Sequence, residues 1–577
     1  MGSDARRITK VNKDIVRISI RELLSLNRMH RDAGSIQQFL ENTELKEQSW
    51  NNALNILQIW MSLQELISKY ALWNERSALP EIKSHLNTVL QLLSKLIFFN
   101  VVKKPKSLKE CFVARLRFDR PLYRYQGWDL PLTCIMPLST EPGQVEFESI
   151  IQTISQLNLD SDFIIILVPG QADNIRRMKN YYNDYNIIIF DEYDLKTLLF
   201  ADDTKILFNR IVIRDIDRRK VQPYSHTSIR PGMFYGRQDE LGEIIRNRGQ
   251  SFAIYGPRRI GKTFLLKQVQ DKINAERACK AIYFSCQNNS IAEVKYRLLR
   301  ELEAQIDIEN VSRFEENLRL IIKNSQHGYV FLLDEIDDLI EEDTRSDYQF
   351  VTSLRNIWNE NREKCQFVFA GFQTLASRFH DQAAPFYNYA APLPLENLKQ
   401  DDAIRLIIQP MEDDLFLEFL DTEACLNRIV ETTMCHPALI QFMCRRLIDI
   451  ACEEKRVYIH PKDIELIFND SEYRSLISRS FWHILEKEQQ IIALQMLQMN
   501  EKFTNVELQA CLAEKNIHVP IADLERNLEK MIASGMITKS EQFYSFANSL
   551  FAPMLRLSED TISLFERLRK EVYVDCE

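Results

Sequence analysis

The stretch from Phe252 to Thr263, FAIYGPRRIGKT, constrains the fold of this chain more than any other part of the sequence. It is an apolar run followed by a loop that is bounded by Gly256 and Gly261 and ends in Lys262 and Thr263. In this pattern a strand leads to the first glycine and the next backbone N–H groups turn inward. A helix then begins near the second glycine with its positive dipole end facing the loop. The stretch therefore predicts a phosphate-binding loop.

The side chains of this loop have predicted roles. Lys262 is expected to reach the outer phosphates of a nucleotide as a point charge, and the Thr263 hydroxyl to ligand Mg²⁺. The glycines let the backbone approach oxygens that a Cβ would exclude. The pattern does not explain why two loop positions are arginines. The other predicted nucleotide-binding residues of the loop and helix start are Gly256, Pro257, Arg258, Arg259, Ile260, Gly261 and Phe264.

A second motif, YVFLLDE, runs from Tyr329 to Glu335. Its apolar residues are typical of a buried strand. At the end of such a strand Asp334 is predicted to hold Mg²⁺ together with the loop hydroxyl, and Glu335 to orient or deprotonate the attacking water. Lys262 and Glu335 are thus the predicted catalytic residues. Asp337 and Asp338 are interpreted as the polar start of a helix without a catalytic part.

Two more apolar runs predict strands of the same sheet, Ala281 to Ser285 and Cys365 to Gly371. The second run is expected to lie between the two motif strands, so the residues after it are candidates to sense the γ-phosphate. These candidates are Gln373, which we include among the predicted nucleotide contacts, and Thr374. A helix cap at this position explains the two residues equally well.

The N-terminal part is expected to form a helical bundle over residues 1–110. Apolar residues recur there at three- and four-residue spacing from Trp50 to Trp73 and from Ile82 to Ile97. Such a stripe fits an internal core or a groove for a partner, and internal packing is favoured. Residues 214–232 are charged, punctuated by proline and poor in apolar periodicity, which predicts a linker.

Short apolar runs alternate with helical stretches over residues 111–213, which predicts βαβ units and a small, Rossmann-like parallel sheet. Its ligand-facing loops would be Pro169 to Gln171 and Asp191-Glu192. A turn and a helix cap, respectively, are the favoured interpretations of these two loops. No arrangement of residues typical of a nuclease, a Ser/His/Asp triad or a Cys/His pair is found here.

Charge and cysteine usage limit the possible partners. The chain has 577 residues, with 73 Lys and Arg against 82 Asp and Glu, so no overall basic excess draws it to nucleic acid or to an anionic membrane. A local basic patch stays possible. The 11 scattered cysteines form no Cys-x-x-Cys pair, which favours a reducing cytoplasm. No apolar run approaches membrane-spanning length, so no transmembrane helix is expected.

Four features together resemble the STAND group of signal-transduction ATPases and their AAA+ relatives of the archaeal-ATPase and origin-recognition type. They are the two motifs already described, Phe234 to Arg237 ahead of the loop, and Cys435-His436-Pro437. The resemblance covers about residues 232 to 560. It implies that adenine packs near Arg237, and that His436, followed by Pro437, reads the phosphates of bound ADP. Cys435 stands where the family has glycine.

The resemblance also gives expectations for the C-terminal part. Arg445 and Arg446 are candidates for a second sensor of the γ-phosphate, although a solvated helix face is the favoured interpretation. Three helices followed by a hairpin predict a winged helix. Its third helix, Ile521 to Ser534, carries several acids, and residues 481–577 hold more Asp and Glu than Lys and Arg. DNA binding by this surface is therefore disfavoured and an intramolecular regulatory role is favoured.

The predicted fold class is α/β, with an AAA+-like P-loop NTPase core, a helical lid and a C-terminal winged helix, preceded by the helical bundle and the small α/β domain. The predicted boundaries are 1–110 for the bundle, 111–213 for the α/β domain, 214–232 for the linker, 233–396 for the core, 397–475 for the lid, and 476–577 for the winged helix and tail.

The predicted function is an ATP-binding and slowly hydrolysing STAND-type switch that uses ATP or ADP with Mg²⁺. We expect it to self-associate on activation, with an unidentified protein or ligand trigger acting through the N-terminal half, as in prokaryotic signalling or defence. Two alternatives are a DNA-binding AAA+ ATPase of initiator or remodelling type and a nucleotide-stabilised scaffold with negligible turnover.

Overall fold

The structure is a computed structural model that describes residues 47–573 with short gaps. The predicted helices before residue 47 lie outside the described residues. No described helix combines the length and apolar character needed to cross a bilayer. The gaps within the described range are residues 74–75, 109, 120–123, 126, 129, 158, 160–161, 180–184, 200, 202, 226–229, 231, 277–278, 303–312, 379–383, 387–388, 500–501, 548–550, 552–554 and 557–559.

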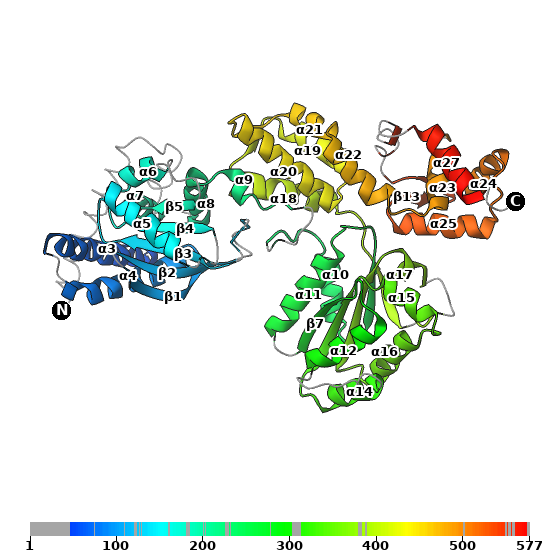
Figure 1. Cartoon of the computed structure of the whole chain (residues 1–577), viewed down its shortest axis with the longest axis horizontal. Helices are drawn as coiled ribbons and strands as arrows, with labels where there is room; N and C mark the ends of the chain where they lie inside the picture. Colours follow the sequence, from blue (N-terminus) through cyan, green and yellow to red (C-terminus); the bar gives the residue numbers. More distant parts are fainter. Residues whose placement is uncertain are drawn as a thin grey trace.

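The N-terminal unit is a five-stranded mixed sheet between helices, drawn in blue and cyan in Figure 1. Its strands follow one another in the sheet in chain order. The first three pair antiparallel and the last three pair parallel. The elements are α3 (Glu47–Trp73), α4 (Leu79–Leu96), β1 (Phe99–Leu108), β2 (Cys111–Phe118), β3 (Leu132–Pro137), α5 (Gln144–Gln156), β4 (Phe163–Leu167), α6 (Asp173–Lys179), β5 (Asn186–Phe190), α7 (Glu192–Leu199) and α8 (Thr204–Asp215).

This unit differs from the prediction in two ways. Strand β1 lies inside the range 1–110, for which a helical bundle was predicted, and the β1–β2–β3 half of the sheet is antiparallel. A connection as short as the one between β1 and β2 joins antiparallel strands only. Helices α3 and α4 bury their apolar stripe, including Trp60 and Leu86, in the same core as Phe112 of the sheet, so they are not a separate bundle.

The segment predicted as a linker is packed against the rest of the chain over its described residues up to 225. It forms the short helix α9 (Arg218–Val221). Tyr224 is fully buried, and its hydroxyl donates to the backbone carbonyl oxygens of Leu406 (3.3 Å) and Ile407 (2.9 Å). The charged composition predicted solvation, but the buried Val221 and Tyr224 anchor the segment instead.

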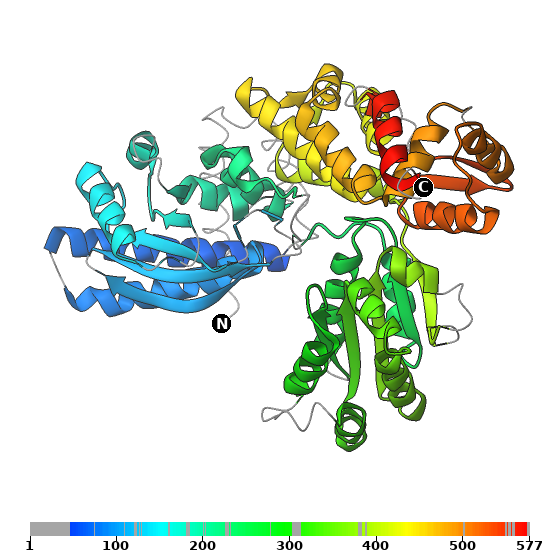
Figure 2. The ribbon, with the colours of Figure 1, turned by 45° about the vertical axis from the view of Figure 1, so that its right-hand side comes forward.

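The nucleotide core, green in Figures 1 and 2, is a five-stranded parallel sheet flanked by helices. The strand order is β10-β6-β9-β8-β7, so β9 lies between the two motif strands, as predicted. The elements are α10 (Gln238–Arg246), β6 (Ser251–Tyr255), α11 (Lys262–Glu276), β7 (Cys279–Ser285), α12 (Ile291–Leu302), α14 (Phe314–Asn324), β8 (Gly328–Asp334), α15 (Asp337–Thr344), α16 (Gln349–Glu360), β9 (Cys365–Gly371), α17 (Gln373–Arg378) and β10 (Ala390–Pro394).

The helical region that was predicted as a lid, named the lid below, and the C-terminal unit complete the described part of the chain. The lid consists of α18 (Gln400–Ile408), the π-helix η2 (Gln409–Asp414), β11 (Glu418–Phe419), α19 (Thr422–Thr433), α20 (Pro437–Glu453), β12 (Tyr458–Ile459), α21 (Pro461–Phe468), α22 (Ser471–Ile477) and the π-helix η3 (Ser478–Trp482). The C-terminal unit consists of α23 (Lys487–Met496), α24 (Asn505–Glu514), α25 (Ile521–Ala533), the antiparallel hairpin of β13 (Ile537–Ser540) and β14 (Phe543–Phe546), and α27 (Thr561–Tyr573).

Apolar packing divides the molecule into two bodies. One continuous core of buried residues joins the N-terminal unit, the lid and the C-terminal unit. Two other clusters lie on the two faces of the nucleotide-core sheet, and a further one lies within the N-terminal unit, between its sheet and helices α5 and α6. In Figure 1 the lid lies between the N-terminal and C-terminal units, and the nucleotide core lies below it. The cavity described next lies where the two bodies meet.

Candidate nucleotide site

The loop between β6 and α11 has the backbone geometry that its glycines predict. Gly256 has φ +154°, and a Cβ there would lie 2.3 Å from the Leu395 carbonyl oxygen of the strand exit next to it. Gly261 has φ +105° with open space around it. Only glycine tolerates both the left-handed backbone and the close approach at position 256. The chain therefore turns tightly from strand to helix and leaves the start of α11 facing a free volume.

Lys262 lies folded over this loop. Its Nζ donates to the carbonyl oxygens of Gly256 and Pro257, each at 2.8 Å. Burial lowers the pKa of the ammonium group to about 8, although Asp337 and Asp334 oppose the shift. The charge is held at the loop by carbonyl dipoles, which a phosphate oxygen can replace.

Asp334 ends β8 directly opposite the start of α11. Its Oδ2 accepts hydrogen bonds from the Thr263 hydroxyl at 2.7 Å and from the Tyr283 hydroxyl at 3.0 Å. A buried carboxylate and a threonine hydroxyl therefore meet beside the loop. These are hard oxygen ligands of the kind that Mg²⁺ uses when phosphates and waters complete its shell. The residues present thus fit Mg²⁺ bound with a nucleotide. Sequence analysis did not identify Tyr283, because an aromatic residue in an apolar strand gives no separate signal.

Glu335 follows Asp334 and faces the cavity. Its backbone is left-handed, with φ +56°, which turns the side chain away from the strand. Its Oε2 accepts a long hydrogen bond from Ser285 Oγ at 3.4 Å. Partial burial and the charge of Asp334 raise the pKa of this carboxyl. A carboxylate in a cavity with a raised pKa has the position and basicity of a general base.

These residues border a cavity of about 610 Å³, a volume typical of small-molecule sites. The P-loop and the two carboxylates form one part of the lining. The rest is mostly apolar and comes from the segment before α10, from α18 and the residues before it, and from the start of α20. The lining residues are Ser225, Arg230, Met233, Phe234, Tyr235, Arg237, Arg258, Arg259, Ile260, Gly261, Lys262, Thr263, Phe264, Gln287, Asp334, Glu335, Leu398, Leu406, Pro437, Ala438 and Gln441.

Several polar residues of this lining were missed by sequence analysis. Ser225 comes from the segment that was predicted as a linker, and Gln441 lies on α20. The Gln441 side-chain oxygen accepts a hydrogen bond from the Ser225 backbone N–H at 3.0 Å. Gln287 and Arg230 also line the cavity. None of these residues belongs to a local motif, so only the tertiary structure brings them to the site.

Arg237 lines the cavity, and Phe264 packs edge-on against Phe234 with ring centroids 5.3 Å apart. The Arg237 guanidinium is fixed by Glu240, at 3.2 Å, and by the Glu396 carbonyl. Arg258 and Arg259 also line the cavity and are exposed. Arg237, Arg258, Arg259 and Phe264 were predicted nucleotide contacts.

His436 does not line the cavity, although the neighbouring Pro437 does. It lies buried behind the loop, where its Nε2 is 3.2 Å from the Arg258 carbonyl oxygen, and its ring packs edge-on against Phe481. Burial lowers the pKa of the imidazole to about 4, so the ring is neutral. Its Nδ1 has no hydrogen-bond partner among the described residues. The histidine thus contacts the backbone of the phosphate loop and not the cavity itself.

The sensor candidates point elsewhere. Gln373 donates to the Lys530 carbonyl oxygen of the C-terminal unit at 3.3 Å, and Thr374 donates to Glu341 at 3.1 Å. Arg446 is paired with Asp470 at 3.2 Å. Arg445 is exposed on α20. The structure brings none of the four to the cavity lining.

Asp337 has a structural role. Its carboxylate accepts the backbone N–H groups of Phe372 at 2.6 Å and Leu375 at 3.1 Å. Asp337 is the first residue of α15, in agreement with its predicted place at the polar start of a helix, and its carboxylate caps the start of a second helix, α17, a contact that was not predicted.

The C-terminal unit touches the phosphate loop directly. Gly535, in the turn after α25, lies so close to Pro257 that a Cβ on it would be 2.5 Å from the proline Cγ. Gln373, at the start of α17, donates a hydrogen bond to the backbone carbonyl of Lys530 in the same unit. Sequence analysis did not predict either contact, because the residues lie far apart in the chain.

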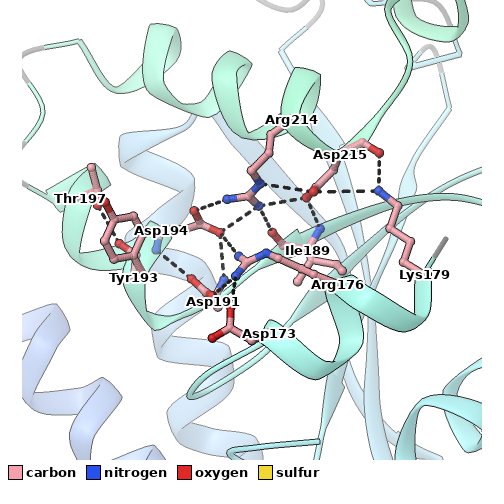
Figure 3. Close-up of polar contacts among 10 residues, drawn as sticks. All are labelled: Asp173, Arg176, Lys179, Ile189, Asp191, Tyr193, Asp194, Thr197, Arg214 and Asp215. Carbon is pink, nitrogen blue, oxygen red and sulfur yellow. Dashed lines mark hydrogen bonds and ion pairs between the residues drawn. The ribbon is translucent and has the colours of Figure 1, made fainter. Parts of the chain in front are cut away.

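One of the two predicted ligand loops of the N-terminal unit, Asp191-Glu192, takes part in an ion network through Asp191 (Figure 3). Arg176 binds Asp191 at 2.6 Å and Asp194 at 3.0 Å, and Arg214 binds Asp194 at 2.7 Å. The Asp191 carboxylate also accepts the Asp194 backbone N–H at 2.9 Å. Asp191 is therefore a helix cap, as the favoured interpretation held.

Comparison with known proteins supports the assignment of the central segment. Residues 245–379 match the protein-family model of an AAA domain. No curated protein matches the chain. Among solved structures, the ORC2 protein of Aeropyrum pernix in ADPNP-ADP complexes is 13% identical with a TM-score of 0.42, covering 59% of this chain and 95% of that chain.

Two other structures are similar over a comparable range. The Walker-type ATPase PABY2304 of Pyrococcus abyssi is 13% identical with a TM-score of 0.41, covering 56% of this chain and 96% of that one. The ORC1 protein of Aeropyrum pernix in complex with DNA is 15% identical with a TM-score of 0.34, covering 58% and 94%. TM-scores this low carry no inference about function. The parallel sheet, the loop geometry and the family match together identify residues 245–379 as a P-loop AAA domain.

Proposed function

We propose that the chain is a Mg²⁺-dependent ATPase that binds ATP and ADP in the cavity between the AAA domain and the lid. One observation carries the proposal. The Thr263 hydroxyl and the Asp334 carboxylate meet at 2.7 Å beside a glycine-bounded loop that opens into a cavity. This arrangement suits a cation bound together with phosphate oxygens.

In the proposed reaction the water oxygen bonds to the γ-phosphorus, the bond to the β–γ bridging oxygen breaks, and the water proton passes to the Glu335 carboxylate. Lys262 exchanges its two carbonyl partners for phosphate oxygens and stabilises the charge that develops on them. Asp334 and Thr263 hold the cation, which neutralises phosphate charge. The products are ADP and inorganic phosphate.

The contacts on the loop support a switch of the STAND type. Gly535 packs against Pro257, and His436 contacts the Arg258 carbonyl, so the lid and the C-terminal unit both contact the backbone that cradles the phosphates. We propose that ADP holds this packing closed and that ATP loosens it and permits self-association. The trigger would act through the N-terminal unit.

The first test is nucleotide binding by calorimetry and sizing of the purified protein with ADP and with ATP and Mg²⁺. Lys262→Ala should weaken ATP binding at least about a hundredfold, since it removes the cation that pairs with buried phosphates. Lys272→Ala, an exposed lysine on the same helix, is the matched control. Unaltered ATP affinity in Lys262→Ala would refute the site. Tight ADP retention without phosphate release would instead identify a scaffold.

A DNA-dependent ATPase is the second candidate, and one local feature favours it. Strand β1 is an edge of the N-terminal sheet and exposes Lys103, Lys104 and Lys106, close to the exposed Arg117 of β2. Within the described residues none of these four cations forms an ion pair with a carboxylate. Edge lysines also prevent unwanted strand pairing, which is the competing explanation.

Binding of a labelled DNA duplex at increasing salt separates these two explanations. A DNA-binding strand predicts steep loss of affinity with salt, stimulation of phosphate release by the duplex, and weaker binding in a Lys103→Gln, Lys106→Gln variant. If the variant and the unaltered protein bind equally weakly and DNA does not affect turnover, the DNA-dependent candidate is rejected.

A further inference from the structure

Arg124 lies where the N-terminal unit, the lid and the nucleotide cavity meet. It belongs to the connection between β2 and β3. Its Nε donates to Asp414 Oδ2 of η2 at 2.6 Å, and its Nη1 donates to the Tyr235 hydroxyl. The side chains of Arg124 and Asp414 are only 8% and 2% exposed. One buried guanidinium therefore joins a carboxylate of the lid to an aromatic residue of the cavity wall.

Asp414 is held by the N-terminal unit from several directions. Its Oδ1 accepts a hydrogen bond from Asn209 at 3.2 Å and lies 3.3 Å from Lys205 Nζ, and both residues lie on α8. The Tyr125 hydroxyl donates to the Asp414 backbone carbonyl at 3.2 Å. A buried carboxylate with this many donors has one favourable position, so the lid and the N-terminal unit are docked in a fixed geometry.

Tyr235 carries this geometry into the cavity. It lines the cavity together with the apolar residues Met233, Phe234 and Leu406. Burial raises the pKa of its hydroxyl to about 12, so the group stays protonated at neutral pH and accepts the bond from Arg124. The guanidinium also lies 6.0 Å from the centre of the Tyr235 ring. The position of the ring therefore depends on a residue of the N-terminal unit.

We propose that Arg124 is a positioning residue that holds Tyr235 against the base of the bound nucleotide. Docking of the N-terminal unit on the lid and binding of the base then strengthen each other, because each favours the same position of Tyr235. The inference rests on the proposed function, in which the phosphates occupy the part of the cavity lined by the P-loop and the base occupies the mostly apolar part. It gives the N-terminal unit a physical route to nucleotide affinity.

Two probes separate this role from a general contribution to stability. ATP reaches both parts of the cavity, whereas inorganic tripolyphosphate reaches only the part lined by the P-loop. A residue that positions the base wall affects the binding of ATP and not that of tripolyphosphate. A residue that merely keeps the domains folded or the lid closed affects both.

The experiment measures the Kd of each probe with Mg²⁺ by calorimetry on the full chain. Tyr235→Phe removes only the hydroxyl, and Arg124→Gln removes the charge. We expect each variant to weaken ATP binding about fivefold to tenfold, with tripolyphosphate binding unchanged. Because both variants break the same bond, the double variant should be no weaker than the weaker single one. Tyr296→Phe, at an exposed tyrosine on α12, is the control for loss of a hydroxyl.

Each result decides a separate question. ATP affinity within twofold of the unaltered protein in Tyr235→Phe overturns the inference, and so does an equal loss for both probes. If Arg124→Gln fails to fold, Tyr235→Phe together with Arg124→Lys gives the same comparison with the buried charge retained. Failure of the unaltered protein to bind ATP at all refutes the proposed function instead, and is recognised because it does not depend on either substitution.

Discussion

Acidic and basic side chains meet at the ends of parallel strands in both sheets of this molecule, but they are paired to different extents. In the N-terminal unit Asp191 and Asp194 are paired with Arg176 and Arg214 (Figure 3). In the AAA domain Glu335 has no cationic partner within hydrogen-bonding distance among the described residues, and a cavity lies in front of it. The carboxyl ends of parallel strands favour ligand sites. The candidate site differs from the ion network in having a carboxylate without a cationic partner next to a cavity.

The glycines at these strand ends show the same contrast. A Cβ on Gly170 would lie 2.2 Å from the Thr140 carbonyl oxygen, much as one on Gly256 would lie 2.3 Å from Leu395. Both positions exclude larger residues because of a close backbone contact. Only the turn at Gly256 continues into a long helix whose first N–H groups face an open volume. A glycine after a strand therefore indicates close packing, and the residues that follow determine whether a ligand can bind.

The largest predicted effect concerns Glu335. Glu335→Gln should lower the rate of phosphate release about a hundredfold to ten-thousandfold, because the general base is lost, while ATP affinity stays within twofold. Single-turnover phosphate release measures it, and Asp338→Asn, an exposed acid on the next helix, is the control. Unchanged turnover in Glu335→Gln would contradict the assignment of the base.

A substitution in the ion network of the N-terminal unit should lower stability and leave nucleotide binding unchanged. Asp194→Ala leaves two arginines without their shared carboxylate, and we expect a loss of about 3 kcal/mol in the free energy of unfolding of the N-terminal unit. Nucleotide affinity should not change, because this network has no part in the cavity. Urea unfolding monitored by circular dichroism tests the loss of stability, and ATP calorimetry on the same sample tests the unchanged affinity. A changed ATP affinity would show that the two strand ends are coupled.

The pH dependence of stability should have opposite signs for His436 of the lid and for Asp194 of the N-terminal unit. His436 has a folded pKa of about 4 against an ordinary value near 6.5, so the unfolded chain binds more protons between these values. Stability from His436 is then present above pH 6.5 and is lost as pH falls toward 4, by up to about 3 kcal/mol. The difference in unfolding free energy between the unaltered protein and His436→Gln, measured from pH 7 to 5, should shrink accordingly. A difference independent of pH would contradict a buried neutral imidazole.

Asp194 should show the opposite slope. Burial and the nearby Asp191 raise its pKa even though Arg214 and Arg176 oppose the shift. The folded state then binds more protons than the unfolded one just above the ordinary pKa of an aspartate, so stability from this group falls as pH rises through the folded value. The contributions of His436 and Asp194 to stability are thus expected to change with pH in opposite directions.

The smallest predicted effect compares two glycines. Gly535→Ala adds a methyl group that clashes with Pro257, and we expect ATP binding about threefold weaker because the overpacking displaces the loop. Gly170→Ala adds a clash of similar closeness at the other strand end and should leave ATP affinity unchanged. Calorimetry on both variants tests the pair. Equal effects, or no effect in Gly535→Ala, would contradict a mechanical link between the C-terminal unit and the loop.

Sequence patterns predicted the elements whose information is local. Strand β6, its loop and α11 follow from adjacent residues, and so do β8 with Asp334 and the order that places β9 between them. The pairs Ser225–Gln441, Pro257–Gly535 and Arg124–Asp414 could not be predicted, since each joins residues far apart in the chain and no local pattern links the two partners. Strand β1 was missed because it lacks the period-two alternation that marks a half-buried strand: its burial pattern is irregular, and its pairing with β2 shifts register on either side of Lys103.

The way the AAA domain is inserted has a mechanical consequence. The chain enters it near Gly236 and leaves it near Leu398, and a Cβ on Gly236 would lie 3.2 Å from the Leu398 side chain. Arg237 and the Glu396 carbonyl are bonded across the same point. Entry and exit therefore lie side by side. A rotation of the AAA domain about this point would have to separate Phe264 from the core that joins the other units, and Pro257 from Gly535, so it would change the packing next to the phosphate loop.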